Sequence, residues 1–204
     1  MPRLVLGAED EATSRRRRVG MDYSAHYESP LGGMTMASDG ESLIGLWFDG
    51  QKYFAETRRE AWVEGAPDGL PIFQRTVQWL DVYFSGKEPD FTPSMRMRTT
   101  PFRRAVWEIL LSIPYGETMT YGEIARRLGP KKNRLRMGAQ AVGGAVGHNA
   151  ISLLIPCHRV VGADGELTGY AGGIDKKIQL LALEGIEWDG LFLPKIDTDA
   201  GRVK

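Results

Sequence analysis

The sequence predicts an α+β fold in which a small sheet-and-helix domain precedes a mostly helical one. Before residue 93, short apolar runs alternate with Asp-Gly turn signals, as in antiparallel strands. After residue 99, apolar residues recur at helical spacing between capping signals. We therefore divide the 204 residues into a flexible basic tail (1–20), an N-terminal α+β domain with its linker (21–93), a C-terminal domain (94–190) and a second tail (191–204).

The composition is that of a globular protein, with 42% hydrophobic residues and no apolar run of membrane-spanning length, so we expect no membrane partner. Cys157 is the only cysteine, which excludes an internal disulfide and favours a reducing compartment. One cysteine and three histidines are too few for the usual zinc site, and we expect a monomer without metal or cofactor.

The charges are distributed unevenly along a chain whose net charge is zero. Residues 21–93 carry twelve acidic and five basic side chains, whereas residues 94–160 carry eleven basic and three acidic ones. A basic segment in a neutral protein favours a polyanionic partner on one face, although a solvated basic surface would have the same composition. The four arginines at 15–18 repel one another and predict a flexible tail.

The N-terminal domain carries signals for two strands and a helix. The segment GGMTMASDGESLIGLWFDG, residues 32–50, predicts two strands joined by a turn at Asp39-Gly40 and followed by one at Asp49-Gly50. A helix is predicted downstream and ends at Gly86. Its apolar residues near helical spacing are Ile72, Val77, Leu80 and Phe84. No combination of residues in this domain suggests chemistry.

Three helical segments are predicted in the first part of the C-terminal domain. Thr100 and Pro101 form an N-cap and first-turn pair ahead of an apolar stripe. The sequence TYGE, from Thr120 to Glu123, is a capping box that opens a second helix, which ends at Gly129. The basic loop PKKNRLR separates this helix from the third segment, MGAQAVGGAVGHN. The stripe of the first helix comprises Phe102, Val106, Ile109, Leu110 and Ile113.

The third segment is unusual as a helix because each of its four glycines costs up to about 1 kcal/mol relative to alanine. Tight packing inside the protein is one explanation. Two short helices around a basic turn also match a helix-turn-helix, whose second helix contacts DNA. A helix with few side chains fits a narrow groove and contacts phosphates through its backbone, so we favour minor-groove insertion. The glycines are Gly138, Gly143, Gly144 and Gly147.

The stretch SLLIPCHRVVG, residues 152–162, contains the only thiol. A lone cysteine is usually a small buried hydrophobe, whereas a nucleophilic one needs a base that is itself oriented by another group. His158 is the candidate base if the backbone after Pro156 is irregular, because neighbouring side chains of a strand point to opposite faces. Glu184, followed by Gly185, ends a predicted helix, where an acid is slightly unfavourable. A partner such as His158 would explain its position, although many helices end in an exposed Glu. The buried positions of that helix are expected to include Ile178, Leu181 and Leu183.

The motifs AVGGAVGHN, IPCHRVVG and GYAGG…LLALEG, in this order and spacing, resemble the O6-alkylguanine-DNA alkyltransferase family. The resemblance is close over residues 99–188 and only general in the N-terminal domain. It implies a ribonuclease H-like first domain and a winged helix-turn-helix-like second domain. It also implies direct-reversal DNA repair, in which O6-alkylguanine, or O4-alkylthymine as a second lesion, is flipped out of DNA. The alkyl group would then pass irreversibly to Cys157 in a single turnover. For such a protein the resemblance implies the cytoplasm, near the nucleoid, in a bacterium and the nucleus in a eukaryote.

The resemblance further implies individual roles. Cys157 would accept the alkyl group, with His158 as a base acting through water and Glu184 as its orienting partner. Asn149 would brace the recognition helix against the active-site turn, and Tyr121 would help to turn out the nucleotide and donate a proton. Substrate contacts are implied for Tyr170, Val160 and Gln140. DNA contacts are expected from Arg104, Ala139, Ala141 and Gly143 and from the loop residues Lys131, Lys132, Arg134 and Arg136.

Three departures from the family pattern stand out. Gln140 occupies the position where many members carry the arginine that fills the gap left by the flipped base. Ala150 replaces the usual proline after Asn149, which affects only local rigidity. The loop GPKKNRLRMG is a few residues longer than in compact members, and we expect its basic residues to add phosphate contacts.

Three other functions fit part of the sequence. A non-catalytic lesion binder of the same fold would replace the cysteine, which this chain keeps. A cysteine hydrolase would use the same Cys, His and Glu but would leave the basic helix-turn-helix without a purpose. A transcription regulator would need side chains for reading base edges, and the Gly/Ala-rich helix has almost none.

Overall fold

The computed structural model describes residues 22–56, 62–64, 70–129 and 138–186, together with Leu191 and Leu193. The first tail, most of the second tail and the loop that contains Lys131, Lys132, Arg134 and Arg136 lie outside the described residues. Phosphate contacts from that loop therefore stay a prediction. Among the described helices, none has the length and apolarity needed to cross a membrane.

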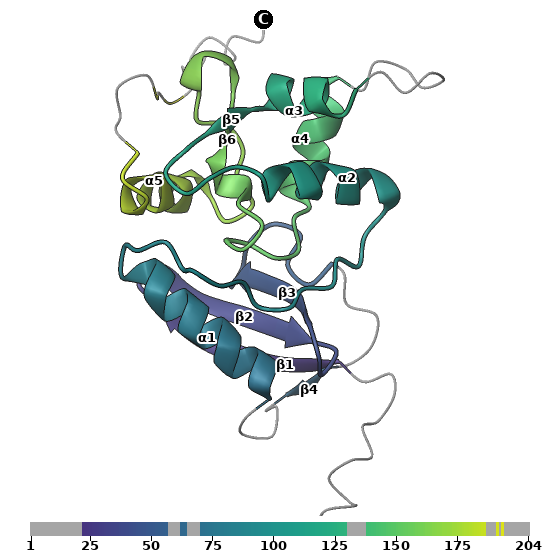
Figure 1. The fold of residues 1–204 in the computed structure, drawn as a ribbon, viewed down its shortest axis with the longest axis vertical. Coiled ribbons are helices and arrows are strands. Elements are labelled where there is room, and N and C mark those ends of the chain that lie inside the picture. Colours follow the sequence, from purple (N-terminus) through teal and green to yellow (C-terminus); the bar gives the residue numbers. More distant parts are fainter. Residues whose placement is uncertain are drawn as a thin grey trace, which may run out of the picture.

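The N-terminal half is a four-stranded sheet with one helix across a face (Figure 1). Strands β1 (Tyr23–Ser29), β2 (Gly32–Ser38) and β3 (Leu43–Phe48) are antiparallel neighbours, and β4 (Val63–Glu64) pairs in parallel with β1. The spatial order is β3-β2-β1-β4, which leaves β3 at the edge nearest the other half. The two strands predicted within residues 32–50 are thereby confirmed as β2 and β3.

Helix α1 (Pro71–Phe84) covers this sheet and begins with a proline at its first turn, where the missing N–H is not needed. Its buried face is Ile72, Phe73, Thr76, Trp79, Leu80 and Tyr83. Val77 and Phe84, which the helical spacing placed on this face, are only partly buried. The buried stripe is therefore shifted toward residues whose large rings reach the second half of the protein.

The C-terminal half contains helices α2 (Pro101–Leu110), α3 (Tyr121–Arg127), α4 (Ala139–Gly147) and α5 (Ile174–Leu183). The predicted caps are present: Thr100 Oγ1 accepts from Arg103 N, and Thr120 and Glu123 form a complete capping box. Strands β5 (Met119–Thr120) and β6 (Val160–Val161) form a parallel pair that connects the start of α3 to the segment after Cys157. With the sheet of the first half, these elements confirm the α+β class.

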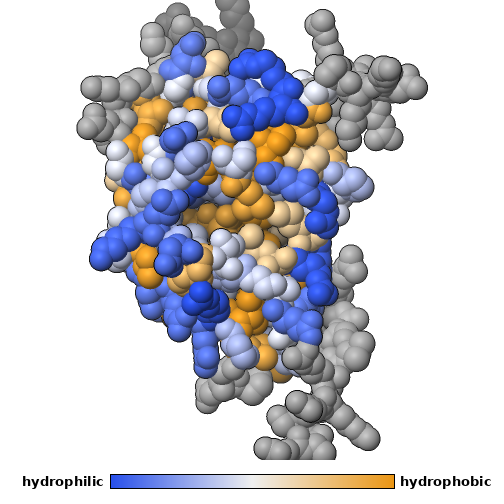
Figure 2. All heavy atoms as spheres, in the orientation of Figure 1, coloured by the Kyte–Doolittle hydropathy of each residue, from blue (hydrophilic) through white to orange (hydrophobic). Residues whose placement is uncertain are grey.

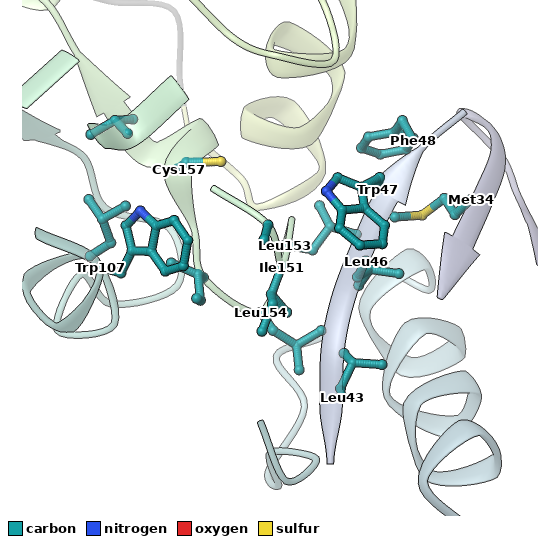
Figure 3. Packing of buried hydrophobic residues seen from close by; sticks show 14 of the residues in the cluster. Met34, Leu43, Leu46, Trp47, Phe48, Trp107, Ile151, Leu153, Leu154 and Cys157 are labelled. Carbon is teal, nitrogen blue, oxygen red and sulfur yellow. The ribbon is translucent and has the colours of Figure 1, made fainter. Parts of the chain in front are cut away.

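Strand β3 joins the two halves through backbone hydrogen bonds at its open edge. Leu43 N donates to Ser94 O and Leu46 N to Ala150 O, both at 2.8 Å, and Ser152 N donates to Leu46 O at 2.8 Å. Figure 3 shows the apolar side chains of β3 packed against the segment that leads to Cys157. The chain before the thiol is thus held in place by the N-terminal sheet.

Candidate active site

The backbone turns sharply before and at Cys157. Leu153 has a φ of +68°, a left-handed conformation that is uncommon outside glycine. Cys157 N donates to Ile155 O at 2.8 Å, and Cys157–Arg159 then forms a single 3-10 turn, η1. The irregular backbone that the Cys-His pair requires is therefore present, and the sulfur points toward the side chains of β3 in Figure 3.

Asn149 holds both this turn and the thiol. Its Nδ2 donates to Ile155 O at 2.7 Å and to Cys157 Sγ at 3.0 Å, while its Oδ1 accepts from Ile151 N at 3.0 Å. The side chain is almost fully buried, so each of these bonds is shielded from water. Asn149 therefore fixes the sulfur relative to the end of α4, which lies two residues earlier in the chain.

Behind the thiol, the Glu184 carboxylate accepts hydrogen bonds from three side chains. His158 Nε2 donates to Glu184 Oε1 at 2.6 Å, so the predicted contact is present. Arg159 binds the carboxylate in bidentate fashion, with Nε at 2.8 Å from Oε2 and Nη2 at 3.1 Å from Oε1. The Tyr83 hydroxyl donates to Oε1 at 2.7 Å and lies 3.3 Å from His158 Nε2. All four side chains are buried.

Burial and these contacts set the protonation states. Burial raises the pKa of the Cys157 thiol, and the Asn149 hydrogen bond only partly opposes this effect. Burial lowers the pKa of His158 despite the opposing Glu184 carboxylate. Burial would raise the pKa of Glu184, but hydrogen bonds from His158 and Arg159 outweigh it and bring that pKa to about 2. At neutral pH the site therefore holds a thiol, a neutral imidazole and a carboxylate.

The neutral imidazole has one nitrogen available as a base. Because Nε2 donates to Glu184, the lone pair is on Nδ1, and Nδ1 is buried without a hydrogen-bond partner among the described residues. His158 follows Cys157 directly in η1, so this nitrogen is the candidate base for activating the thiol. No group of three or more His, Cys, Asp or Glu side chains in the described part of the chain is arranged to hold a metal ion.

The structure places Tyr121 and Tyr170 around the same sulfur. The Tyr121 hydroxyl lies 3.5 Å from Gly169 O, and a negative charge on Cys157 would raise the pKa of Tyr121 beyond the effect of burial. Burial likewise raises the pKa of Tyr170 well above its usual value, and the Ser152 side chain opposes this effect only in part. Both phenols stay protonated at neutral pH and are able to donate.

Val160 is also at the site, but both of its backbone groups are engaged. Its N–H donates to Cys157 O, and its carbonyl accepts from Lys177 Nζ. A carbonyl has a second lone pair, so Val160 O retains the capacity for one further donor. The contact of Val160 with a guanine edge stays a prediction.

Helix α4 presents a smooth exposed surface. Ala139, Gln140, Ala141 and Gly144 are exposed, while Val142, Ala145 and Val146 face the core. A Cβ at Gly138 or Gly144 would meet no atom of the described residues within 4 Å, so packing against them does not require glycine there. The alternative, close approach of an outside partner, is the explanation that agrees with this geometry.

Of the other predicted DNA contacts, Gly143 lies beside this surface and Arg104 makes a hydrogen bond within the protein. A Cβ at Gly143 would lie 3.8 Å from the Tyr121 ring, so α4 passes directly over the candidate proton donor. Arg104 is exposed on α2, and its Nη2 donates to Met97 O at 2.7 Å. Trp107 of the same helix donates to Ala145 O at 2.8 Å and fixes α2 against α4.

Three buried polar residues at this site were not predicted from the sequence. Arg159 lies within the quoted motif but had no assigned role. Tyr83 corrects the expectation that the N-terminal domain has no chemistry, because it reaches Glu184 from α1. Lys177 is fully buried on α5. Of the positions of this helix that were expected to be buried, Leu181 is buried, whereas Ile178 and Leu183 are only partly buried. The available signal for Lys177 was its position four residues before Leu181 on an apolar helix face.

A pocket of about 230 Å³ opens between the two halves, where Figure 2 shows apolar residues gathered on the visible face. Tyr83 and Arg159 form part of its wall, but Cys157 does not. This pocket therefore lies behind the carboxylate network and is not the space in front of the thiol.

Known proteins share both halves of this architecture. The family profile described as "6-O-methylguanine DNA methyltransferase, DNA binding domain" matches residues 101–186, and the one described as "6-O-methylguanine DNA methyltransferase, ribonuclease-like domain" matches residues 23–95. The methylated-DNA--protein-cysteine methyltransferase of Mycobacterium bovis is 44% identical over 162 residues, which cover 78% of this chain and 92% of the relative. Its namesake from Haemophilus influenzae is 40% identical over 167 residues, with 81% and 88% covered.

A solved structure agrees with these sequence matches. The crystal structure of Mycobacterium tuberculosis OGT in complex with DNA superposes with a TM-score of 0.68 at 41% identity, over 79% of this chain and 92% of that one. The profiles cover most of the chain, and the relatives are aligned over nearly their whole length. By these matches, the chain belongs to the 6-O-methylguanine DNA methyltransferase family.

Proposed function

We propose that this protein repairs DNA by direct reversal, moving the alkyl group of O6-alkylguanine onto Cys157 and keeping it there. The observation that carries the proposal is the position of the only thiol. It is bonded to Asn149 on one side, backed by the His158–Glu184 pair, and placed near Tyr121 beneath the exposed face of α4. The membership of the family and the names of its relatives support the same reaction.

The transfer would proceed as a single displacement. The thiol proton moves to His158 Nδ1, directly or through one water, and Glu184 stabilises the imidazolium that forms. The sulfur attacks the alkyl carbon, so that an S–C bond forms while the C–O6 bond breaks. Guanine leaves with the bonding electrons and takes a proton, for which the Tyr121 hydroxyl is the proposed donor. The product is a thioether, and none of the proposed steps hydrolyses it, so one molecule acts once.

The proposed mode of DNA binding follows from α4. Apart from Gln140, its exposed residues are small, which allows the helix backbone to come close to phosphates in the minor groove. O6 alkylation removes a base-pairing proton and weakens the pair, so flipping the damaged base costs less than the usual few kcal/mol. The base pair of O4-alkylthymine is weakened in the same manner, so this base is a second proposed lesion. We propose that the protein acts as a monomer.

Mass spectrometry tests this proposal directly. The protein is incubated with a duplex that contains one O6-methylguanine, and its intact mass and peptide map are recorded. We expect one added methyl group per molecule, located on Cys157, with no further turnover in excess DNA. An unmodified duplex of the same sequence is the control for the lesion. Catalytic turnover, or an unchanged protein mass, would contradict alkyl transfer.

Cys157→Ser separates transfer from binding. This variant is expected to bind the damaged duplex with wild-type affinity and to gain no methyl group, because serine lacks the thiolate nucleophile. Wild-type transfer by the variant would show that another residue accepts the group.

A further inference from the structure

Lys177 is a lysine without exposure to solvent, located on the second turn of α5. Its ammonium group donates to Val160 O and to Thr168 O, the latter at 2.8 Å. These carbonyls lie on the strand after the thiol and on the loop that leads to Tyr170. Two carbonyl acceptors satisfy two of the three N–H donors of an ammonium group but do not neutralise its charge.

The buried charges of the site do not balance without a further anion. Glu184 is neutralised by Arg159 in a bidentate pair, and the buried Asp22 is neutralised by Arg98. Among the ion pairs of the described residues, none includes Lys177. A buried cation is stable only when it is paired, or when it gives up its proton. Burial indeed lowers the pKa of Lys177 to about 8, so the lysine is still largely charged at neutral pH.

The groups that face this cation leave one candidate anion. Cys157 and His158 of η1 interact with Lys177 electrostatically, and Tyr121 and Tyr170 face the thiol from α3 and the loop after β6. Both phenols have raised pKa values and stay neutral, and His158 is neutral as well. Glu184 is already paired with Arg159. Among the described residues around Lys177, the thiol of Cys157 is the remaining group that can become negative.

We propose that Lys177 is the counter-ion of the Cys157 thiolate, a positioning residue that stabilises the ionised sulfur and fixes the two carbonyl segments around it. Its charge favours the thiolate as soon as His158 takes the proton, and it does so without contacting the alkyl group. Asn149 supplies the hydrogen bond to the sulfur and Lys177 supplies the charge. The effect on alkyl transfer rests on the proposed function, whereas the effect on the thiol itself does not.

The single cysteine makes the test direct, because any thiol reagent reports on Cys157 alone. The rate of modification by iodoacetamide is measured against pH in the full-length protein, in Lys177→Met and in Lys177→Arg. Lys176→Met is the matched control, since it removes the neighbouring lysine, whose Nζ lies over the Phe48 ring. In Lys177→Met we expect the thiol titration to move up by about one pH unit, which is about tenfold less thiolate at neutral pH.

The control variants separate charge from packing. Lys177→Arg keeps the charge and is expected to titrate close to the wild type, and Lys176→Met is expected to be unchanged. If the Cys157 thiol of Lys177→Met titrates at the same pH as in the wild type, the proposal is overturned. Transfer from an O6-methylguanine duplex should slow about as much as the thiolate fraction falls, at unchanged DNA affinity. If transfer is absent from every form while the thiol titrations shift as expected, the proposed function fails and the counter-ion assignment stands.

A measurement on the wild-type chain covers the case in which Lys177→Met does not fold. Methyl methanethiosulfonate converts the thiol to an uncharged mixed disulfide, without any need for DNA. The titration of Lys177 is followed by NMR of labelled lysine side chains before and after this reaction. We expect the blocked protein to release the Lys177 proton at a lower pH, because the free thiol can ionise beside Lys177 as the pH rises and the blocked sulfur cannot. An unchanged Lys177 titration would overturn the proposal.

Discussion

The Tyr83 hydroxyl donates a hydrogen bond of 2.7 Å to the Glu184 carboxylate, which lies 101 residues later in the chain. Through this contact α1 of the N-terminal half reaches the pair that orients His158. Burial raises the pKa of Tyr83 well above its usual value, so the phenol is a permanent donor. The N-terminal half therefore both holds the thiol segment at β3 and completes the carboxylate network.

Tyr83→Phe is expected to weaken this network without disturbing its packing, because the ring stays stacked on Trp79. A hydrogen bond to a charged group contributes about 1.5–3 kcal/mol, so the free energy of unfolding in urea should fall by about 2 kcal/mol. Alkyl transfer should slow several-fold, since Glu184 orients His158 less firmly. Tyr27→Phe is the matched control: its hydroxyl donates to Asp81 at 2.8 Å in a more exposed position. Equal losses in the two variants would contradict a special role for Tyr83.

The stability should fall steadily in acid. Glu184 binds a proton near pH 2 in the folded protein and near 4.5 when unfolded, so its contribution is complete above pH 4.5 and is lost as the pH falls toward 2. The pKa of His158 is below 6.5 in the fold, so the unfolded chain takes up this proton first and stability already declines below pH 6.5. Urea unfolding at pH 7, 5.5 and 3.5 measures both effects.

Glu184→Gln isolates the carboxylate part of this pH dependence. At pH 7 the variant should be less stable by about 3–5 kcal/mol, because Arg159 is left buried and unpaired. Below pH 4.5 the difference should narrow, since only the wild type loses the stabilisation from an ionised Glu184. Parallel stability curves for the two proteins down to pH 3.5 would refute the assignment of the low pKa.

The parts of this protein that local sequence determines were predictable. The capping box at Thr120 and Glu123 and the glycine that follows α5 act within a few residues, and they occur where the sequence places them. The helix-end position of Glu184 was only a weak signal for a partner, because an acid there is slightly unfavourable, and the family resemblance supplied the pairing with His158. The roles of Tyr83 and Lys177 were not predictable, because their partners come from segments that only the tertiary fold brings together. An amphipathic pattern also treats both positions as apolar.

Gly144→Ala should have opposite effects on the free protein and on its complex. The added Cβ meets open space on α4, so the higher helix propensity of alanine should stabilise the free protein by up to about 1 kcal/mol. DNA affinity should decrease, because the methyl group keeps the helix backbone away from the groove. Gly147→Ala is the matched control on the same helix, where the Cβ would lie 3.9 Å from the Tyr53 ring. Urea unfolding and fluorescence anisotropy with a damaged duplex measure the two effects, and equal DNA affinity in both variants would exclude α4 as the contact surface.

Gln140→Arg should make base flipping more favourable. Gln140 is exposed near the start of α4, at the position where many family members carry an arginine that fills the gap left by the flipped base. Arginine has a planar fork of donors that can pair with the orphaned base, and glutamine has a single amide. Single-turnover transfer from duplex O6-methylguanine should therefore speed up several-fold. Transfer from the same strand without its complement should not change, because no orphaned base is present. Gln140→Lys adds the same charge without the fork, so equal acceleration by lysine would assign the gain to phosphate attraction instead of pairing.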